Sequence, residues 1–198
     1  YQDYQDCRDL HLTVEVFNND SIFADLMQFL RLNGFSRSDF VRMVHERSRS
    51  DDKIGQIFTD FRAEEKQNLR NSRTELDEFT REPGVIDRYV SGEHGTNELY
   101  KYRVVALFGH LERVHAIAYE VARKLIEDTG KMDAKTELYL SELHELSVLR
   151  KTSPLETDQR HAREFHFDFV QLMDNHFLTD PFNFYHADGV ELEIFHSN

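Results

Sequence analysis

The sequence predicts a mainly α fold of the α+β class: a multi-helix bundle around a long central helix, with a small antiparallel β element formed near the termini. Two observations carry this prediction. Apolar residues recur with the period of a helix over most of the chain, and the longest such run covers residues 96–128. Two stretches near the chain ends, 10–17 and 182–195, alternate with the period of a strand instead.

The length of the chain fits one domain, at 198 residues and 23.5 kDa. We expect residues 1–198 to form a single helical domain. Its expected parts are a strand lead-in over 1–17, a helical bundle over 20–176 and a β-hairpin over 182–196. No internal repeat or low-complexity linker divides the sequence.

The first predicted element is a strand over residues 10–17, because every second residue is apolar and Val, Thr and Phe are frequent there. The polar run Asn18-Asn19-Asp20-Ser21 ends the strand and offers an N-cap for a helix that stops at Asn33-Gly34. Ser36-Arg37-Ser38-Asp39 opens the next helix, which carries Phe40 and Val44 on one face.

Three further elements are expected before residue 95. A helix runs over 51–70, and Ser72-x-x-Glu75 forms a capping box for the following one. Pro83-Gly84 ends that segment, and 85–90 forms a short helix or turn. A loop with two glycines, residues 91–95, then leads into the longest element.

The predicted central helix covers residues 96–128, where apolar residues keep the helical period until Thr129-Gly130 closes it. Small residues such as Ala106 and Ala118 would let neighbouring helices approach closely. Another amphipathic helix follows over 133–150, with leucines along one face.

The last third of the chain gives a strong start signal, Ser153-Pro154-Leu155-Glu156, which predicts a helix to about residue 175. Alternating Phe165, Phe167 and Phe169 permit a strand there instead, but the capping box favours the helix. Ala187-Asp188-Gly189 lies between two apolar stretches and predicts the turn of a hairpin. The strand over 10–17 could join this hairpin.

Charge and cysteine content restrict the function. The net charge of −13 and the scattered basic residues argue against nucleic acid as the main partner. Cys7 is the single cysteine, so the chain can form neither an internal disulfide nor a thiolate metal cluster, which suits a cytoplasmic location. No apolar run is long enough for a membrane span. There is no nucleophile elbow and no phosphate-binding loop.

One arrangement could hold a metal ion. Glu112-x-x-His115 lies on the predicted central helix, and residues three apart share a helix face, as in carboxylate-bridged di-iron bundles. His161 and Glu164 could add ligands, although their order is reversed relative to that motif. Because this spacing also arises by chance, solvated helix faces are the simpler interpretation.

A second candidate site is a polar and aromatic patch at the start of the predicted central helix. It could contact an anionic ligand or another domain, since helix N-termini favour negative charge. The simpler alternative is that Tyr102 packs inward while Glu98 and Lys101 pair at the surface. The patch comprises Glu93, Asn97, Glu98, Tyr100, Lys101 and Tyr102.

Two stretches resemble the C-terminal region of cobalamin-binding radical-SAM proteins. The first is Leu10-His11-Leu12-Thr13-Val14-Glu15-Val16-Phe17-Asn18-Asn19-Asp20, followed by an amphipathic helix. The second is Pro83-Gly84-Val85-Ile86-Asp87-Arg88-Tyr89-Val90-Ser91-Gly92-Glu93, continuing to Tyr102. The likeness covers residues 1 to about 128.

The resemblance implies a larger parent enzyme that binds cobalamin, S-adenosylmethionine and a [4Fe–4S] cluster. The cluster motif, Cys-x-x-x-Cys-x-x-Cys, is impossible with one cysteine, so no catalytic residue or cofactor is expected in this chain. Its implied role is a helical accessory domain whose partners are the remaining domains of the parent, or another protein. A start at Tyr1 is what we expect of such a piece. The alternatives are a free-standing helical metal-binding protein and a protein-interaction module.

Overall fold

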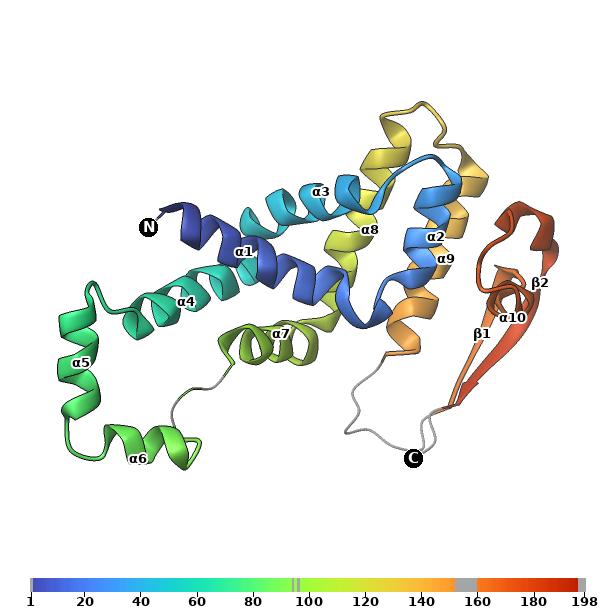
Figure 1. Cartoon of the computed structure of the whole chain (residues 1–198). Coiled ribbons are helices and arrows are strands. Elements are labelled where there is room, and N and C mark those ends of the chain that lie inside the picture. The colour runs from blue at the N-terminus through green and yellow to red at the C-terminus, as the bar shows by residue number, and fades with distance from the viewer. Residues whose placement is uncertain (1, 94, 96, 152–159, 196–198) are drawn as a thin grey trace.

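The computed structural model describes residues 2–93, 95, 97–151 and 160–195. In this part of the chain it contains ten α-helices, two short 3-10 helices and one two-stranded antiparallel sheet, which confirms the mainly α class with a small β element (Figure 1). Seven helices form the bundle: α1 (Gln2–Phe17), α2 (Ala24–Leu32), α3 (Arg37–Arg49), α4 (Asp52–Asn68), α7 (Glu98–Gly109), α8 (Leu111–Glu127) and α9 (Ala134–Leu149).

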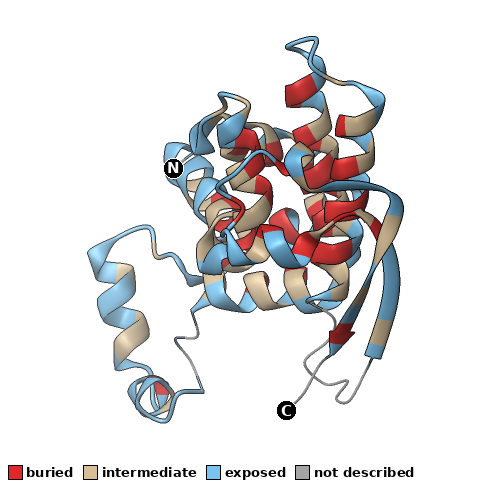
Figure 2. Ribbon diagram, turned by 90° about the vertical axis from the view of Figure 1, so that its right-hand side faces the viewer, coloured by how far each residue is buried: buried red, intermediate tan, exposed pale blue. Residues whose placement is uncertain are grey.

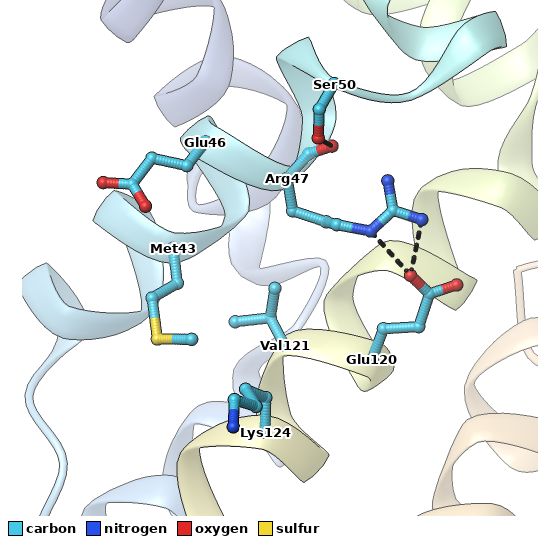
Figure 3. A pocket seen from close by; sticks show the side chains of 7 residues that line it. All are labelled: Met43, Glu46, Arg47, Ser50, Glu120, Val121 and Lys124. Carbon is cyan, nitrogen blue, oxygen red and sulfur yellow. Dashed lines mark hydrogen bonds and ion pairs between the residues drawn. The ribbon is translucent and has the colours of Figure 1, made fainter. Parts of the chain in front are cut away.

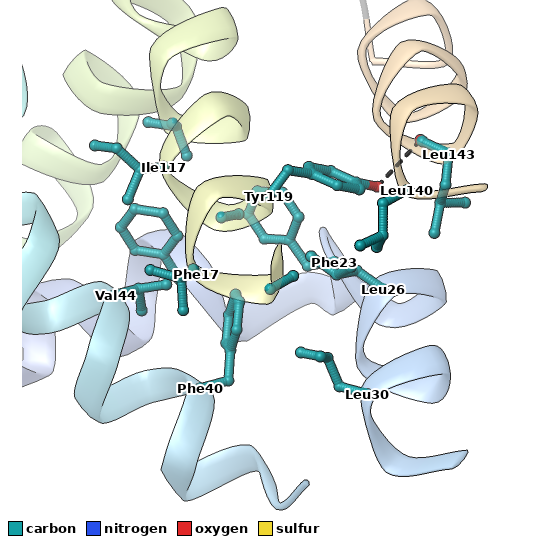
Figure 4. Packing of buried hydrophobic residues seen from close by; sticks show 14 of the residues in the cluster. Phe17, Phe23, Leu26, Leu30, Phe40, Val44, Ile117, Tyr119, Leu140 and Leu143 are labelled. Atoms are coloured by element: carbon teal, nitrogen blue, oxygen red, sulfur yellow. Dashed lines mark hydrogen bonds between the residues drawn. The ribbon is translucent and has the colours of Figure 1, made fainter. Parts of the chain in front are cut away.

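Helix α8 lies at the centre of the bundle and packs against α3, α7 and α9. Its buried face meets aromatic and aliphatic side chains from α2, α3 and α9, which interdigitate in one continuous core (Figure 4). The Tyr119 hydroxyl donates a hydrogen bond of 3.1 Å to the carbonyl oxygen of Leu143, so even the polar tip of this buried ring has a partner. Burial of this apolar surface is the main stabilising contribution to the fold.

The starts of α3 and α5 follow the predicted capping signals, whereas the N-cap predicted over residues 18–21 is wrong, because α2 begins at Ala24 after Phe23 and has no side-chain cap. Ser36 and Asp39 form a complete capping box at α3, and Asp51 accepts bonds from two backbone N–H groups at the start of α4. Ser72 accepts from the backbone N–H of Glu75 at 3.1 Å, while the Glu75 carboxylate bonds the backbone N–H of Asn71. These caps satisfy N–H groups that have no partner within the helix.

The predicted strand over residues 10–17 is wrong, because this stretch belongs to helix α1. Leu12 and Val16 are buried one helical turn apart, together with Thr13 and Phe17, whereas Leu10 is exposed. Leu12 and Val16 fit a strand face as well as a helix face, so the alternation was ambiguous. Since α3, α4 and α7 surround α1, tertiary packing decides for the helix, and this segment does not join the sheet.

The predicted central helix is interrupted at His110. Asn97 caps α7, which ends at Gly109, and α8 begins at Leu111. His110 has φ −142° and ψ 33°, outside the helical region. Glycine is a poor helix former, so the chain bends there at low cost. Residue 96, the predicted start, lies outside the described residues.

The helix predicted up to residue 175 is replaced by strand β1 (Arg160–Phe167) and the short helix α10 (Phe169–Asp174). The alternating phenylalanines are the reason, because Phe165 and Phe167 both point into the core from one face of β1. The capping signal Ser153-Pro154-Leu155-Glu156 lies outside the described residues.

The predicted hairpin over 182–196 is also wrong, because Tyr185–Phe195 form one continuous strand, β2, after the 3-10 helix Pro181–Phe184. Strand β2 pairs with β1, and the ladder is irregular between Phe165 and Phe167. Gly189 has φ +76° within this irregularity, and a Cβ there would lie 2.7 Å from the side chain of Glu164. The glycine therefore serves a bulge and a close approach, not a hairpin turn.

Helices α5 (Arg73–Arg81) and α6 (Val85–Val90) form an arm that stands apart from the bundle in two perpendicular views (Figures 1 and 2). The two helices pack mainly against each other. Gly84 joins them in the left-handed region, at φ +79°. We call residues 70–93 the arm.

Candidate functional site

The predicted patch at the start of α7 is largely anchored to helix α4. The Lys101 ammonium lies 2.6 and 2.8 Å from the two carboxylate oxygens of Glu64, and the Tyr102 hydroxyl donates to the same carboxylate at 2.8 Å. The hydrogen bond from Lys101 lowers the pKa of Glu64, and burial followed by the bond to Glu64 raises the pKa of Tyr102. These three side chains therefore hold α7 to α4.

The remaining patch residues divide into paired and projecting groups. Asn97 accepts a bond from the backbone N–H of Tyr100 at 3.3 Å, and Glu98 accepts from the Asn68 side chain at 2.7 Å. Glu98 and Lys101 thus pair with α4 and not with each other, while Tyr102 packs inward as the simpler alternative predicted. Tyr100, at 62% exposure, and Glu93, the last residue of the arm, are exposed to solvent.

The four residues predicted for a metal site do not come together. Glu112 is exposed, whereas His115 is fully buried and bonds the carbonyl oxygen of Leu111 through Nδ1 at 2.9 Å. His161 and Glu164 lie on strand β1 rather than on a helix. Within the described residues, no group of three or more His, Cys, Asp or Glu side chains is placed to hold a metal ion.

The structure reveals a buried polar cluster between α8 and α9 that the sequence analysis missed. His144 stacks on Tyr119 with ring centroids 4.5 Å apart, and the Lys151 ammonium lies 2.6 Å from the Ser147 hydroxyl oxygen. Burial lowers the pKa of His115 to about 3 and that of Lys151 to about 8. The sequence signal that could have indicated this cluster is the spacing of Ser147 and Lys151, which are one helical turn apart.

Burial lowers the pKa of both histidines, His115 and His144, and so favours their neutral imidazoles at neutral pH, whereas Lys151, with a pKa of about 8, stays mostly protonated there. His115 donates through Nδ1 to a backbone carbonyl, so its Nε2 is an acceptor, and that buried atom has no hydrogen-bond partner among the described residues. A neutral imidazole is the form that such surroundings tolerate. The cluster is therefore a point of pH sensitivity in the core.

A pocket of about 420 Å³ lies between α3 and α8 (Figure 3). Both oxygens of Glu120 are engaged, one by Arg47 at 2.8 Å and the other by Arg113 at 2.8 Å. A ligand that bound the charge of Glu120 or of either arginine would first have to break this ion-pair network. The lining residues are Met43, Glu46, Arg47, Ser50, Glu120, Val121 and Lys124.

The arm carries several exposed apolar side chains and few buried ones, unlike the helices of the bundle. Helix α5 buries no residue, and Val85 is the one fully buried side chain of α6. Leu76, Ile86 and Val90 are 47%, 52% and 83% exposed. Apolar side chains gathered on one projecting element are typical of a contact surface for another protein.

No protein-family model, no curated protein and no solved structure matches this chain.

No helix in the described ranges combines the length and the apolar character needed to cross a membrane.

Proposed function

We propose that this chain is a helical accessory domain of a larger cobalamin-dependent radical-SAM enzyme and is not catalytic by itself. The observation that carries the proposal is the placement of the two stretches on which the resemblance rests. The first stretch forms the C-terminal half of α1 and the residues just after it, the second runs from α6 into α7, and α1 packs directly against α7 (Figure 1).

A charged contact joins the same two elements. Arg103 on α7, the residue after the second stretch, pairs with Asp20 in the 3-10 helix Asn19–Ser21, and its guanidinium lies 4.0 Å from the carboxylate of Glu15 on α1. Two stretches that are far apart in sequence thus belong to one packed unit. This supports treating the resemblance as one of a folded domain rather than of isolated segments.

The donor set of this chain does not fit the parent's iron–sulfur cluster. A [4Fe–4S] cluster requires several cysteine thiolates, and Cys7 is the single cysteine, exposed on α1. In the proposal, the cluster, S-adenosylmethionine and cobalamin are therefore held by other domains. A chain with one cysteine also suits the reducing cytoplasm, which we propose as its location.

In the proposed enzyme, the domain packs on the catalytic domains and shapes access to them. The exposed side chains of Tyr100 and of the arm, which includes Glu93, are available for that contact. Glu64, Lys101 and Tyr102 serve the domain's own packing, so they are not expected to touch substrate.

Cofactor analysis of two purified proteins tests the proposal. The native polypeptide from its source cells should contain iron, acid-labile sulfide and cobalamin, whereas the isolated 198-residue chain should contain none of them. A native polypeptide without cobalamin and without a cluster, even after anaerobic purification, contradicts the proposal.

A free-standing interaction module is the second candidate, and the exposed apolar residues of the arm favour it. The two candidates differ in whether the chain is part of a longer polypeptide. An accessory domain would belong to a larger enzyme, whereas the interaction module would be active as a polypeptide of 23.5 kDa.

A further inference from the structure

We propose that the α5–α6 arm is the element by which this domain docks on another domain of the same parent polypeptide. The contact face of that domain would be apolar at its centre and rich in lysine and arginine at its rim. The inference rests on the proposed function and extends it by assigning the surface and the chemistry of its partner.

The arm cannot be stable by itself. Helix α5 has nine residues and α6 has six, and isolated helices shorter than about 12–15 residues are marginal in water. Buried apolar contacts normally stabilise such short helices, but Val85 is the one fully buried residue that the two helices contain. Leu76, Ile86 and Val90 are the exposed apolar side chains that a partner surface could cover.

The position of the arm directs it away from the bundle. Its two connections leave from the C-terminal end of α4 and enter the N-terminal end of α7, and these two helices pack against each other. The arm is thus attached at both ends to two helices that pack against each other, while both views place it apart from the remaining helices (Figures 1 and 2). This geometry presents the arm to another body and leaves the core of the bundle intact.

Charge selects the partner. The arm, residues 70–93, contains six acidic side chains and four arginines, and the whole chain carries a net charge of −13. A second copy would bring the same negative charge to the contact, and like charges oppose association. A partner with a basic rim instead attracts the arm, while its apolar centre covers the exposed side chains.

Amide hydrogen exchange measured by mass spectrometry tests the docking in the native polypeptide and in the isolated chain. Amides of residues 73–90 should exchange at least about tenfold more slowly in the native polypeptide, because docking suppresses local opening. The variant Leu76→Glu should abolish this difference. Leu178→Glu is the matched control, since Leu178 is 49% exposed against 47% for Leu76 and lies outside the arm.

A charge variant tests the chemistry of the rim. Asp77→Lys combined with Glu78→Lys should reduce the protection of the arm in the native polypeptide, and the loss should be smaller in high salt because screening weakens the original attraction. If the double variant leaves protection unchanged while Leu76→Glu abolishes it, the assignment of a basic rim is wrong.

The remaining outcomes separate the docking from the proposed function. Equal exchange of the arm in a native polypeptide well above 23.5 kDa overturns the docking and leaves the accessory-domain proposal standing. A native mass of 23.5 kDa overturns both. Protection in the isolated chain that rises with protein concentration identifies a second copy as the occupant and overturns the assigned partner.

Discussion

Helix α8 and the arm are both amphipathic, yet they differ in what covers their apolar faces. Nine of the seventeen residues of α8 are buried, whereas α5 and α6 together bury Val85 alone among fifteen. The neighbours of α8 are other helices of the bundle, whereas the two helices of the arm pack mainly against each other. Amphipathic sequence therefore shows that a helix face requires cover but does not identify the element that provides it.

The largest expected difference concerns one leucine in each region. Leu140→Ala removes a fully buried side chain from the bundle core and should lower the free energy of unfolding by about 2–5 kcal/mol. Leu76→Ala in the arm should change it by less than about 0.5 kcal/mol, because Leu76 is not packed in the bundle. Urea denaturation of the isolated chain measures both. Comparable losses would show that the arm is part of the cooperative core.

Acid should destabilise the bundle through His115. Burial lowers its pKa from 6.5 to about 3, so the folded state favours the neutral imidazole, and the associated stability is present above pH 6.5 and lost as pH falls toward 3. Between pH 7.5 and pH 5 this group alone should cost about 2 kcal/mol.

The variant His115→Gln should reduce this pH dependence, whatever its effect on stability at pH 7.5. His11→Gln is the control, because His11 is exposed on α1. The free energy of unfolding, measured by thermal or urea unfolding at several pH values, tests this prediction. An unchanged slope of this free energy against pH in His115→Gln would show that the imidazole is not protonated on unfolding.

Replacement of the two capping serines should have effects of intermediate size. Ser36→Ala removes the N-cap of α3 and should destabilise the bundle by about 1 kcal/mol. Ser72→Ala removes the N-cap of α5 and should instead increase amide exchange within the arm while leaving global unfolding unchanged. Global destabilisation by Ser72→Ala would contradict the separation of the two regions.

The smallest expected effect is at the ion pair between α4 and α7. Lys101→Met should cost at most about 0.5 kcal/mol, because Lys101 is half exposed and surface pairs contribute little. The difference should vanish in high salt. A cost that persists in high salt would show that Lys101 stabilises α7 by packing rather than by charge.

The starts of α3 and α5 were predictable from sequence because capping is local: Ser36 and Ser72 act within one turn of themselves. The start of α2 was not, because the polar run over 18–21 is followed by Phe23, which makes no side-chain cap. The helical conformation of α1 was not predictable, because the spacing of Leu12 and Val16 fits both a strand and a helix. Packing against α3, α4 and α7 determines that the segment is a helix. Strand β1 was missed for a similar reason, because a local start signal was preferred over the alternation of Phe165 and Phe167.

The candidate site was predictable only in part. Inward packing of Tyr102 follows from its place in the helical period, but its partner Glu64 depends on the register between α4 and α7, which no local pattern gives. The grouping of His115 with His144 likewise depends on how α8 meets α9. The uncovered face of the arm could not be predicted at all, because amphipathic periodicity is the same for covered and uncovered helices.

The intact mass of the native polypeptide in its source cells tests the central claim most directly, namely that this chain is one domain of a larger enzyme. An antibody against the bundle and mass spectrometry of the captured protein give the measurement. The account predicts a mass several-fold above 23.5 kDa, with Cys-x-x-x-Cys-x-x-Cys upstream of Tyr1. A native mass of 23.5 kDa would contradict it.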